Sequence, residues 1–331
     1  FVAQVSEDSL TAVSLVFPIQ TLLIAFAVGT GVGINSLVAR RLGEKRQDEA
    51  DNAATHGLLL GICNWILFAL IGLFGSQPFF AAFTSDAALI KMGVDYMSIV
   101  CIFSFGVFVE INIEKMLQAT GNMIYPMIFQ LIGAVVNIIL DPVFIFGYLG
   151  IPAMGVAGAA IATVIGQILS MITALIVLFT QEHDVKVQLR GFRFHWQTVK
   201  NIYVVGAPSI VMQAIGSVMT IGMNAILITF GNTAVAFFGV YFKLQSFVFM
   251  PVFGLTQGVM PIMGYNFGAR NKHRLLSALR ICCIIAIVIM AVGLVVFQLI
   301  PAQLLSIFNA SSNMLAIGVP ALRTISLCFI P

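Results

Sequence analysis

Long apolar segments constrain this chain more than any other feature. Hydrophobic residues make up 60% of its 331 residues and charged residues only 9%, and the mean hydropathy is +1.04. A soluble domain averages about 25% charged residues, so these proportions leave no polar surface for one. A helix needs about 20 mostly apolar residues to cross a bilayer. About nine stretches meet that length: 9–39, 53–80, 88–114, 124–148, 154–180, 200–230, 233–265, 275–300 and 311–331. The sequence therefore predicts an all-α polytopic membrane protein.

An internal repeat organises these segments into two halves. Residues 17–46 align with residues 242–271 without a gap, at a constant offset of 225 residues. The identical pairs include Phe17 and Phe242, Gln20 and Gln245, Gly29 and Gly254, Gly33 and Gly258, and Gly43 and Gly268. Such a repeat predicts two six-helix bundles related by a pseudo-two-fold axis along the membrane normal. At this offset the first helix of one bundle falls before Phe1 and the last helices of the other fall beyond Pro331, so we expect a fragment of a larger protein.

The same offset predicts how the chain is divided. We expect an amino-terminal lobe at 1–181 with its first helix largely missing, a polar linker at 182–199, and a carboxy-terminal lobe at 200–331 without its last helices. Transporters commonly place their binding site between two such halves. A cleft is therefore expected between the lobes, with walls formed by the first and seventh spans.

Basic residues are concentrated in the loops on one side of the predicted spans. Most of the 16 lysines and arginines lie in the loops after the first, fifth and seventh spans, whereas Lys91 is the one basic residue in the opposite loops. The positive-inside rule makes the basic side cytoplasmic. We expect these loops to meet anionic lipid headgroups, and the formal charge of +3 gives no indication of nucleic-acid binding.

A carboxylate inside the fourth predicted span is the strongest functional signal. All 13 acidic residues lie at or before Asp184, and Asp141 is the one acid within the apolar stretch 126–148. A charged side chain at the bilayer centre costs at least ~2.5–3.5 kcal/mol, and such residues usually handle protons, cations or substrate. Asn137 lies one turn earlier on the same helix face. Pro142 follows, removes a backbone donor and is expected to act as a hinge.

Three further residues are candidates for the same chemistry. Counted from the helix ends, Tyr96 and Thr163 are expected at the depth of Asp141. Phenol, hydroxyl, amide and carboxylate groups can bind a hard cation or hydrogen-bond a protonated acid. The alternative for Tyr96 and Thr163 is that they satisfy only their own backbone or water. Glu110 is a secondary candidate because it lies deeper in its span than Glu114, which we interpret as part of an interfacial cluster.

Other classes of function find little support in the residues. The sequence has no HExxH or GxSxG motif, and its histidines lack metal-ligand spacing, so we expect neither an enzyme nor a metal site apart from Na⁺ at Asp141. The glycines at positions 29, 31 and 33 lie inside an apolar helix and follow no strand. This context predicts close helix packing or a bend rather than a phosphate loop.

Four segments resemble one transporter family. They are GVGINSLVARRLG at 31–43, its repeat GVMPIMGYNFG at 258–268, NIILDPVFIFG at 137–147 and GAAIAT at 158–163. These segments are similar to bacterial members of the multidrug and toxic compound extrusion (MATE) family. The resemblance implies a twelve-helix antiporter of the bacterial inner membrane that exports cationic or lipophilic drugs in exchange for H⁺ or Na⁺. Such an antiporter needs no cofactor apart from the coupling ion, and we expect it to be a monomer.

The resemblance also assigns roles to the candidate residues. Asp141 and Asn137 match the family's amino-lobe cation or proton site, and Tyr96 and Thr163 match its supporting polar residues. The family places a further essential acid on the first helix, which this chain lacks. The alternative function is a lipid or lipid-linked oligosaccharide flippase of a related fold. Such a flippase is expected to line its cavity with several basic residues, and only Lys243 and Arg323 lie within the predicted spans.

Overall fold

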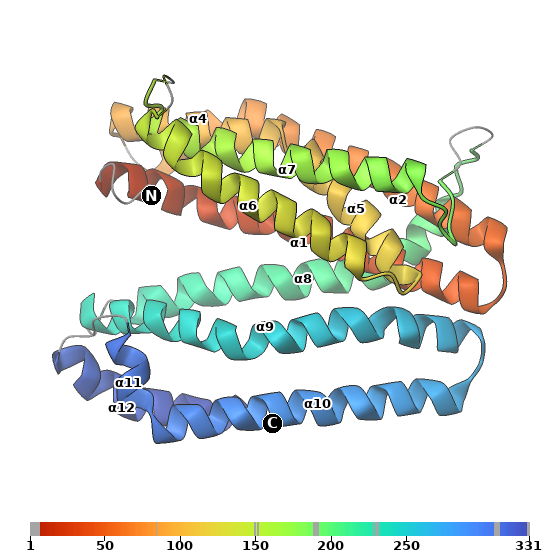
Figure 1. Cartoon of the computed structure of the whole chain (residues 1–331). Coiled ribbons are helices and arrows are strands. Elements are labelled where there is room, and N and C mark those ends of the chain that lie inside the picture. Colours follow the sequence, from red (N-terminus) through yellow and green to blue (C-terminus); the bar gives the residue numbers. More distant parts are fainter. Residues whose placement is uncertain are drawn as a thin grey trace. The chain divides into compact units, whose positions relative to one another are not determined.

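A computed structural model describes residues 7–83, 85–148, 150, 152–187, 192–227, 229, 232–307 and 312–329 (Figure 1). The described residues form helices joined by short loops, and the prediction of an all-α fold is confirmed. The helices are α1 (Glu7–Gly43), α2 (Gln47–Leu70), η2 (Ile71–Gly75), α3 (Ser76–Phe83), α4 (Ala87–Ile102), α5 (Phe105–Ala119), α6 (Ile124–Phe146), α7 (Gly155–Thr180), α8 (Trp196–Leu227), α9 (Asn232–Gly268), α10 (Lys272–Leu299), α11 (Pro301–Ser306), α12 (Ser312–Ser326) and η4 (Leu327–Phe329).

Fewer uninterrupted spans are present than the predicted nine. Among the described residues, 7 helices are long and apolar enough to cross a membrane, and α4 with α5 makes an eighth if the pair counts as one bent span. The predicted span at 88–114 corresponds to this pair, which bends by 40°. The predicted span at 311–331 contains a shorter apolar helix, Asn313–Phe329. The chain is nonetheless an integral membrane protein by its series of long apolar helices.

Side chains compensate the break between α4 and α5. The indole Nε1 of Trp65 donates a 2.8 Å hydrogen bond to the carbonyl of Ile102, the last residue of α4. The hydroxyl of Ser104 donates to the carbonyl of Cys101 over 2.7 Å. In an apolar environment each unsatisfied carbonyl is costly, so these two donors allow the helix to bend at 103–104.

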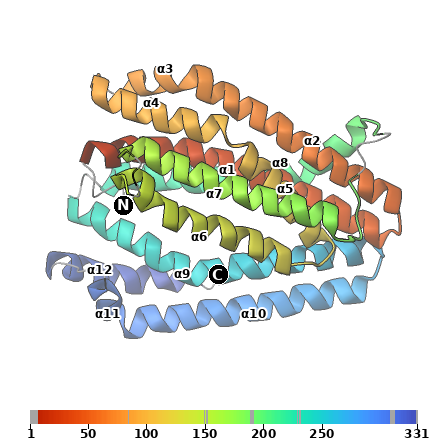
Figure 2. The same cartoon turned by 45° about the horizontal axis from the view of Figure 1, so that its top comes forward.

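The chain forms two compact units, residues 1–214 and 215–331. In the first unit, α6 and α7 run side by side (Figures 1 and 2). Its largest apolar cluster joins α1, α2, α5 and the start of α8, with Ile34, Ile113 and Ile202 fully buried. In the second unit, a separate cluster joins α9 to α12 and includes Phe237 and Leu322. The boundary between the units falls inside α8, and the predicted lobe limits at 182–199 stay a prediction.

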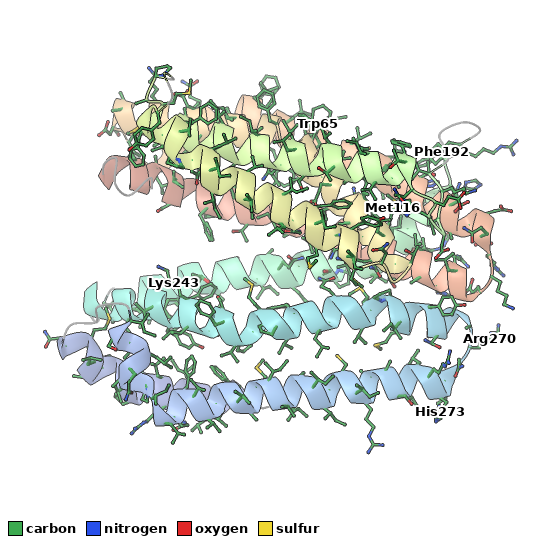
Figure 3. The ribbon with its side chains drawn as sticks, viewed as in Figure 1. Trp65, Met116, Phe192, Lys243, Arg270 and His273 are labelled. Carbon is green, nitrogen blue, oxygen red and sulfur yellow. The ribbon has the colours of Figure 1, made fainter. Side chains whose placement is uncertain are left out.

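Apolar side chains also cover the outer surfaces of the helices, as the sticks along α10 illustrate (Figure 3). On α10 the exposed fraction is 57% for Ile281, 56% for Val288 and 59% for Val292. Soluble monomers rarely expose contiguous apolar surfaces of this kind, whereas lipid-facing helices must.

Glycines bring helices of the first unit into close contact. A Cβ added at Gly33 of α1 would lie 2.2 Å from the carbonyl oxygen of Ile202 on α8. A Cβ added at Gly29 would lie 2.3 Å from the Ile210 side chain, also on α8. The prediction that these glycines serve helix packing is confirmed for α1 and α8.

A cluster of charges closes the hairpin between α1 and α2. Glu44 accepts hydrogen bonds from Arg40 over 2.9 Å and from Arg41 over 2.6 Å, and Arg41 also pairs with Glu49 over 3.1 Å. Partial burial raises the pKa of the Glu44 carboxyl, but the hydrogen bonds from the two arginines outweigh it and hold the pKa below its usual value. The arginines of this hairpin are thus paired with carboxylates rather than repelling one another.

Candidate functional site

Asn137, Asp141 and Thr163 come together where α6 packs against α7. Asn137 Nδ2 donates to Asp141 Oδ1 over 3.2 Å and to Thr163 Oγ1 over 3.3 Å. Thr163 Oγ1 in turn donates to the carbonyl of Ala159 over 2.9 Å, within α7. The close approach of the two helices depends on small residues, because a Cβ at Gly166 would lie 2.8 Å from the carbonyl oxygen of Gly133. All three polar side chains are partly buried.

Tyr96 takes a different partner. Its side chain on α4 is 6% exposed, and its hydroxyl accepts a 3.0 Å hydrogen bond from Gln20 of α1. Within the described part of the chain, no hydrogen bond links Tyr96 to Asp141, whose carboxylate is bonded to Asn137. Tyr96 is therefore held by α1.

Pro142 lies inside α6, which continues through it. The helix ends at Phe146, and Gly147 adopts a left-handed backbone conformation with φ of 80°. The N–H of Gly147 donates to the carbonyl of Val143 over 3.1 Å. The chain thus turns sharply one turn after the proline, and the role of Pro142 as a hinge stays a prediction.

A pocket of about 400 Å³ opens beside this cluster within the first unit. It brings Asn137 and Thr163 together with Glu110, whereas Asp141 and Tyr96 are not among its lining residues. The wall consists of apolar residues and six residues with polar side chains; its full lining is Ile24, Val28, Val107, Glu110, Ile111, Gln130, Gly133, Ala134, Asn137, Thr163, Gln167 and Ser170.

Glu114 belongs to a buried network of polar side chains. Glu114 is 5% and Lys115 4% exposed, and Lys115 Nζ lies 3.2 Å from Glu114 Oε1. Gln118 donates to Glu114 Oε1 over 2.8 Å, and Gln130 donates to Glu114 Oε2 over 2.8 Å. Both carboxylate oxygens are satisfied by donors inside the bundle, which makes the charge tolerable there. The interpretation of Glu114 as part of an interfacial cluster stays a prediction.

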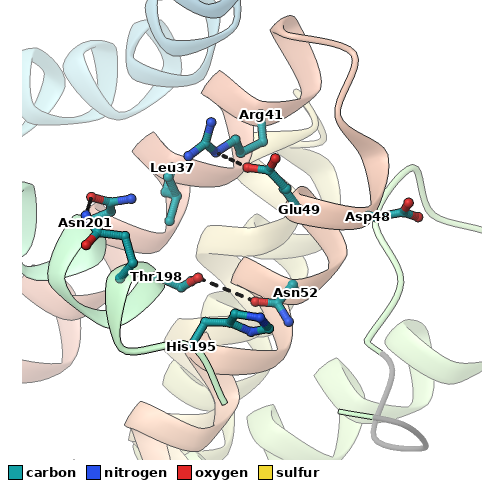
Figure 4. Close-up of a pocket in the computed structure, with 9 residues that line it drawn as sticks. Leu37, Arg41, Asp48, Glu49, Asn52, His195, Thr198 and Asn201 are labelled. Atoms are coloured by element: carbon teal, nitrogen blue, oxygen red, sulfur yellow. Dashed lines mark hydrogen bonds and ion pairs between the residues drawn. The ribbon is translucent and has the colours of Figure 1, made fainter. Parts of the chain in front are cut away.

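The linker and the first turns of α2 and α8 form a second, polar pocket of about 480 Å³ (Figure 4). Arg41 pairs with Glu49 across this region, and Thr198 contacts Asn52 at 3.5 Å. The lining residues are Leu37, Arg41, Asp48, Glu49, Asn52, His195, Gln197, Thr198 and Asn201. This pocket contains none of the predicted site residues.

The family is decided by a match that covers most of the chain. The model of the MatE family matches residues 1–143 and 208–331. The chain belongs to the MatE family. Both matched segments contain one copy of the internal repeat, and the first contains Asn137 and Asp141.

Relatives of this MatE chain include multidrug exporters. It is 25% identical to the multidrug export protein MepA of Staphylococcus haemolyticus over 318 aligned residues. The aligned region covers 96% of this chain and 69% of that protein. The chain is 27% identical over 291 residues to MepA of Staphylococcus aureus, covering 87% of this chain and 62% of that protein. The chain thus spans about two thirds of the length of these relatives.

Solved MATE structures share the fold. An outward-facing multidrug resistance MATE transporter of the MOP superfamily matches with a TM-score of 0.90 at 28% identity, over 98% of this chain and 72% of that one. A MATE structure in the straight conformation matches with a TM-score of 0.92 at 28% identity, over 99% of this chain and 73% of that one. The predicted two-bundle helical fold is confirmed by these matches.

Two polar residues of this MatE site escaped the sequence analysis. Gln20 was seen only as a member of the repeat, paired with Gln245, and no motif in the sequence contains Gln167. The presence of glutamine at equivalent positions of both repeats, Gln20 and Gln245, could have indicated that Gln20 belongs to the candidate site. Gln167 lies one turn beyond Thr163 on α7 and was visible only by helix face.

Proposed function

We propose that this chain is the main part of a secondary antiporter that exports cationic or lipophilic drugs in exchange for H⁺ or Na⁺. The proposal places coupling at the carboxylate of Asp141. The multidrug export proteins among the relatives support the substrate class. The whole transporter would lie in a bacterial inner membrane as a monomer, with the basic loops on the cytoplasmic side and in contact with lipid headgroups.

The observation that carries the proposal is the contact between Asn137 and Asp141. An amide, a carboxylate and the Thr163 hydroxyl meet inside an apolar helix pair, connected by hydrogen bonds of 3.2 and 3.3 Å. Oxygen ligands of this kind suit Na⁺, and a carboxylate can bind a proton instead. Binding of either ion neutralises the carboxylate, so an ion gradient can act on the transporter through this one group. Tyr96 supports the site from α4, where Gln20 holds its hydroxyl.

The adjoining pocket favours a cationic substrate over an anionic one. Its lining contains the carboxylate of Glu110 and no lysine or arginine. A flippase for an anionic lipid-linked sugar needs basic groups to bind phosphate. The charge of this pocket therefore supports drug export rather than the flippase alternative.

Transport by the full-length protein in liposomes tests the proposal. An H⁺ gradient and a Na⁺ gradient are imposed in separate experiments. A fluorescent cation should be exported under one of them, and that gradient identifies the coupling ion. Asp141→Asn retains the shape of the side chain but cannot titrate, so it should abolish gradient-driven export. Asp95→Asn, which changes an exposed carboxylate on α4, is the matched control and should transport normally. Export by Asp141→Asn at the wild-type rate, at equal expression, would exclude Asp141 as the coupling residue.

A further inference from the structure

Two buried oxygen atoms with unsatisfied hydrogen-bonding capacity border the same pocket. Oε1 of Glu110 and Oε1 of Gln167 are buried, and neither has a hydrogen-bond partner among the described residues. Both residues line the pocket of about 400 Å³ beside Asn137. Buried polar atoms are nearly always partnered in proteins, and each exception calls for an explanation.

Helix packing brings the two residues to the same pocket. At the contact of α5 with α7, a Cβ added to Gly106 would lie 3.1 Å from the backbone carbon of Gln167. Glu110 lies four residues beyond Gly106, so it occupies the same face of α5 one turn along. Two acceptors from two helices therefore face one pocket.

Neighbouring charges do not satisfy Glu110. Lys115 Nζ, on the same helix, is 3.2 Å from Glu114 and donates to Gln118 over 2.9 Å. Gln130, which also lines the pocket, donates to Glu114 over 2.8 Å. The donors near this turn of α5 are thus engaged with Glu114, while Glu110 is 5% exposed and has no such donor in the described part of the bundle.

We propose that Glu110 and Gln167 bind the ammonium group of an organic cation whose apolar body lies against Ile24 and Val107. An ammonium with N–H bonds supplies donors to both oxygens, and its charge neutralises the carboxylate. A pocket of 400 Å³ with apolar walls is within the usual range for a small organic ligand. This inference rests on the proposed function and adds to it a binding site for the cationic group of the substrate, separate from the coupling carboxylate.

Equilibrium binding to the purified full-length transporter tests the site. The probe is monodansylcadaverine, a primary ammonium with an apolar fluorophore, and its uncharged N-acetyl derivative is the comparison ligand. The wild type should bind the ammonium at least about tenfold more tightly than the derivative, a typical effect for a charge-assisted pair. Glu110→Gln should remove that preference while retaining the affinity for the N-acetyl derivative.

Two further variants make the test specific. Gln167→Met removes the amide acceptor at similar volume and should reduce the preference for the ammonium to an intermediate level. It also tests the site independently if Glu110→Gln fails to fold. Asp95→Asn should bind both ligands like the wild type, because its carboxylate is exposed on α4. An unchanged preference for the ammonium in Glu110→Gln or in Gln167→Met would overturn the proposal.

A competition experiment separates an organic cation from an alkali ion. Added Na⁺, exchanged for K⁺ so that the ionic strength stays constant, should leave probe binding unchanged in the wild type and in Asp141→Asn. Displacement of the probe by Na⁺ that disappears in Glu110→Gln would mean that the site binds the metal ion, and would overturn the assignment. The proposed function fails separately, if the wild type exports no cation under either gradient.

Discussion

Asn137 donates its side-chain amide to the carboxylate of Asp141 over 3.2 Å, one turn further along α6. The same amide donates to the hydroxyl of Thr163 on α7 over 3.3 Å. Because the two acceptors lie on different helices, the amide joins the carboxylate to the α6–α7 contact. A change of charge at Asp141 therefore alters the hydrogen bonding between two helices, which is a direct way to couple ion binding to helix movement.

The first prediction concerns that amide. Asn137→Ala should lower gradient-driven export about tenfold, because it removes a donor to a partly buried carboxylate, a loss of roughly 1–3 kcal/mol. The measurement is the initial rate of uptake of a fluorescent cation into inverted vesicles. Thr163→Ser, which retains the hydroxyl, should transport near the wild-type rate. If Asn137→Ala transports as fast as Thr163→Ser, the amide has no part in coupling.

Periodicity and helix depth predicted part of this site. The four-residue spacing placed Asn137 and Asp141 on one face, and the structure joins them by a hydrogen bond. Depth alone placed Thr163 near them, which the contact with Asn137 bears out geometrically. Depth could not predict which neighbouring side chain forms the hydrogen bond. Tyr96 was expected beside Asp141, but its hydroxyl is hydrogen-bonded to Gln20. That choice depends on how α1 and α4 are rotated against each other, which a single sequence does not specify.

The charged residues of α5 show a second limit of sequence reasoning. Glu110 and Glu114 share a helix face one turn apart, so spacing could not distinguish them. The difference arises from α6, which supplies Gln130 to Glu114 and no donor to Glu110 within the described residues. Similarly, hydropathy could not locate the bend between α4 and α5, which depends on Trp65 reaching the Ile102 carbonyl.

The second prediction concerns the hydrogen bond between Gln20 and Tyr96. Tyr96→Phe and Gln20→Leu should each destabilise the protein, and a double-mutant cycle should give a coupling of about 1 kcal/mol, as for a typical buried hydrogen bond. Thermal unfolding in detergent is the measurement. Thr21→Val is the control, since among the described residues the Thr21 hydroxyl donates to the carbonyl of Phe17, within its own helix. Additive effects of Tyr96→Phe and Gln20→Leu would show that the two side chains do not interact.

The third prediction uses the internal repeat as its own control. Gly33→Ala places a methyl group 2.2 Å from the Ile202 carbonyl oxygen, and backbone cannot yield as a side chain does. Overpacking of this kind typically costs about 1–3 kcal/mol. Gly258 is the repeat equivalent of Gly33, and a Cβ there meets no described atom within 4 Å. In a protein of these 331 residues, Gly258→Ala should therefore be neutral or slightly stabilising in the same unfolding assay. Equal destabilisation by the two substitutions would contradict the α1–α8 contact described above.

The last prediction is a pH dependence at the linker. His56 of α2 is fully buried, and its Nδ1 donates to the carbonyl of Asn52 over 2.8 Å. Its Nε2 accepts the backbone N–H of His195, in the linker, over 2.9 Å. This pair of bonds requires the neutral ring with its proton on Nδ1, because a second proton on Nε2 would face a donor. Acidification that protonates His56 should therefore release His195 from α2, whereas neutral or higher pH should hold it.

Hydrogen exchange at the His195 amide measures this release. The protection factor, which is corrected for the intrinsic effect of pH, should fall about tenfold from pH 8 to pH 5, as expected for the loss of one buried hydrogen bond. His56→Gln offers a donor and an acceptor without titrating, so its protection should change little over that range. His273→Gln alters an exposed histidine on α10 and should retain the wild-type pH dependence. A pH dependence that persists in His56→Gln would place the titrating group elsewhere. His195 itself and Asp51 would then be tested next, because the Asp51 carboxylate accepts the N–H of Lys186 in the same linker.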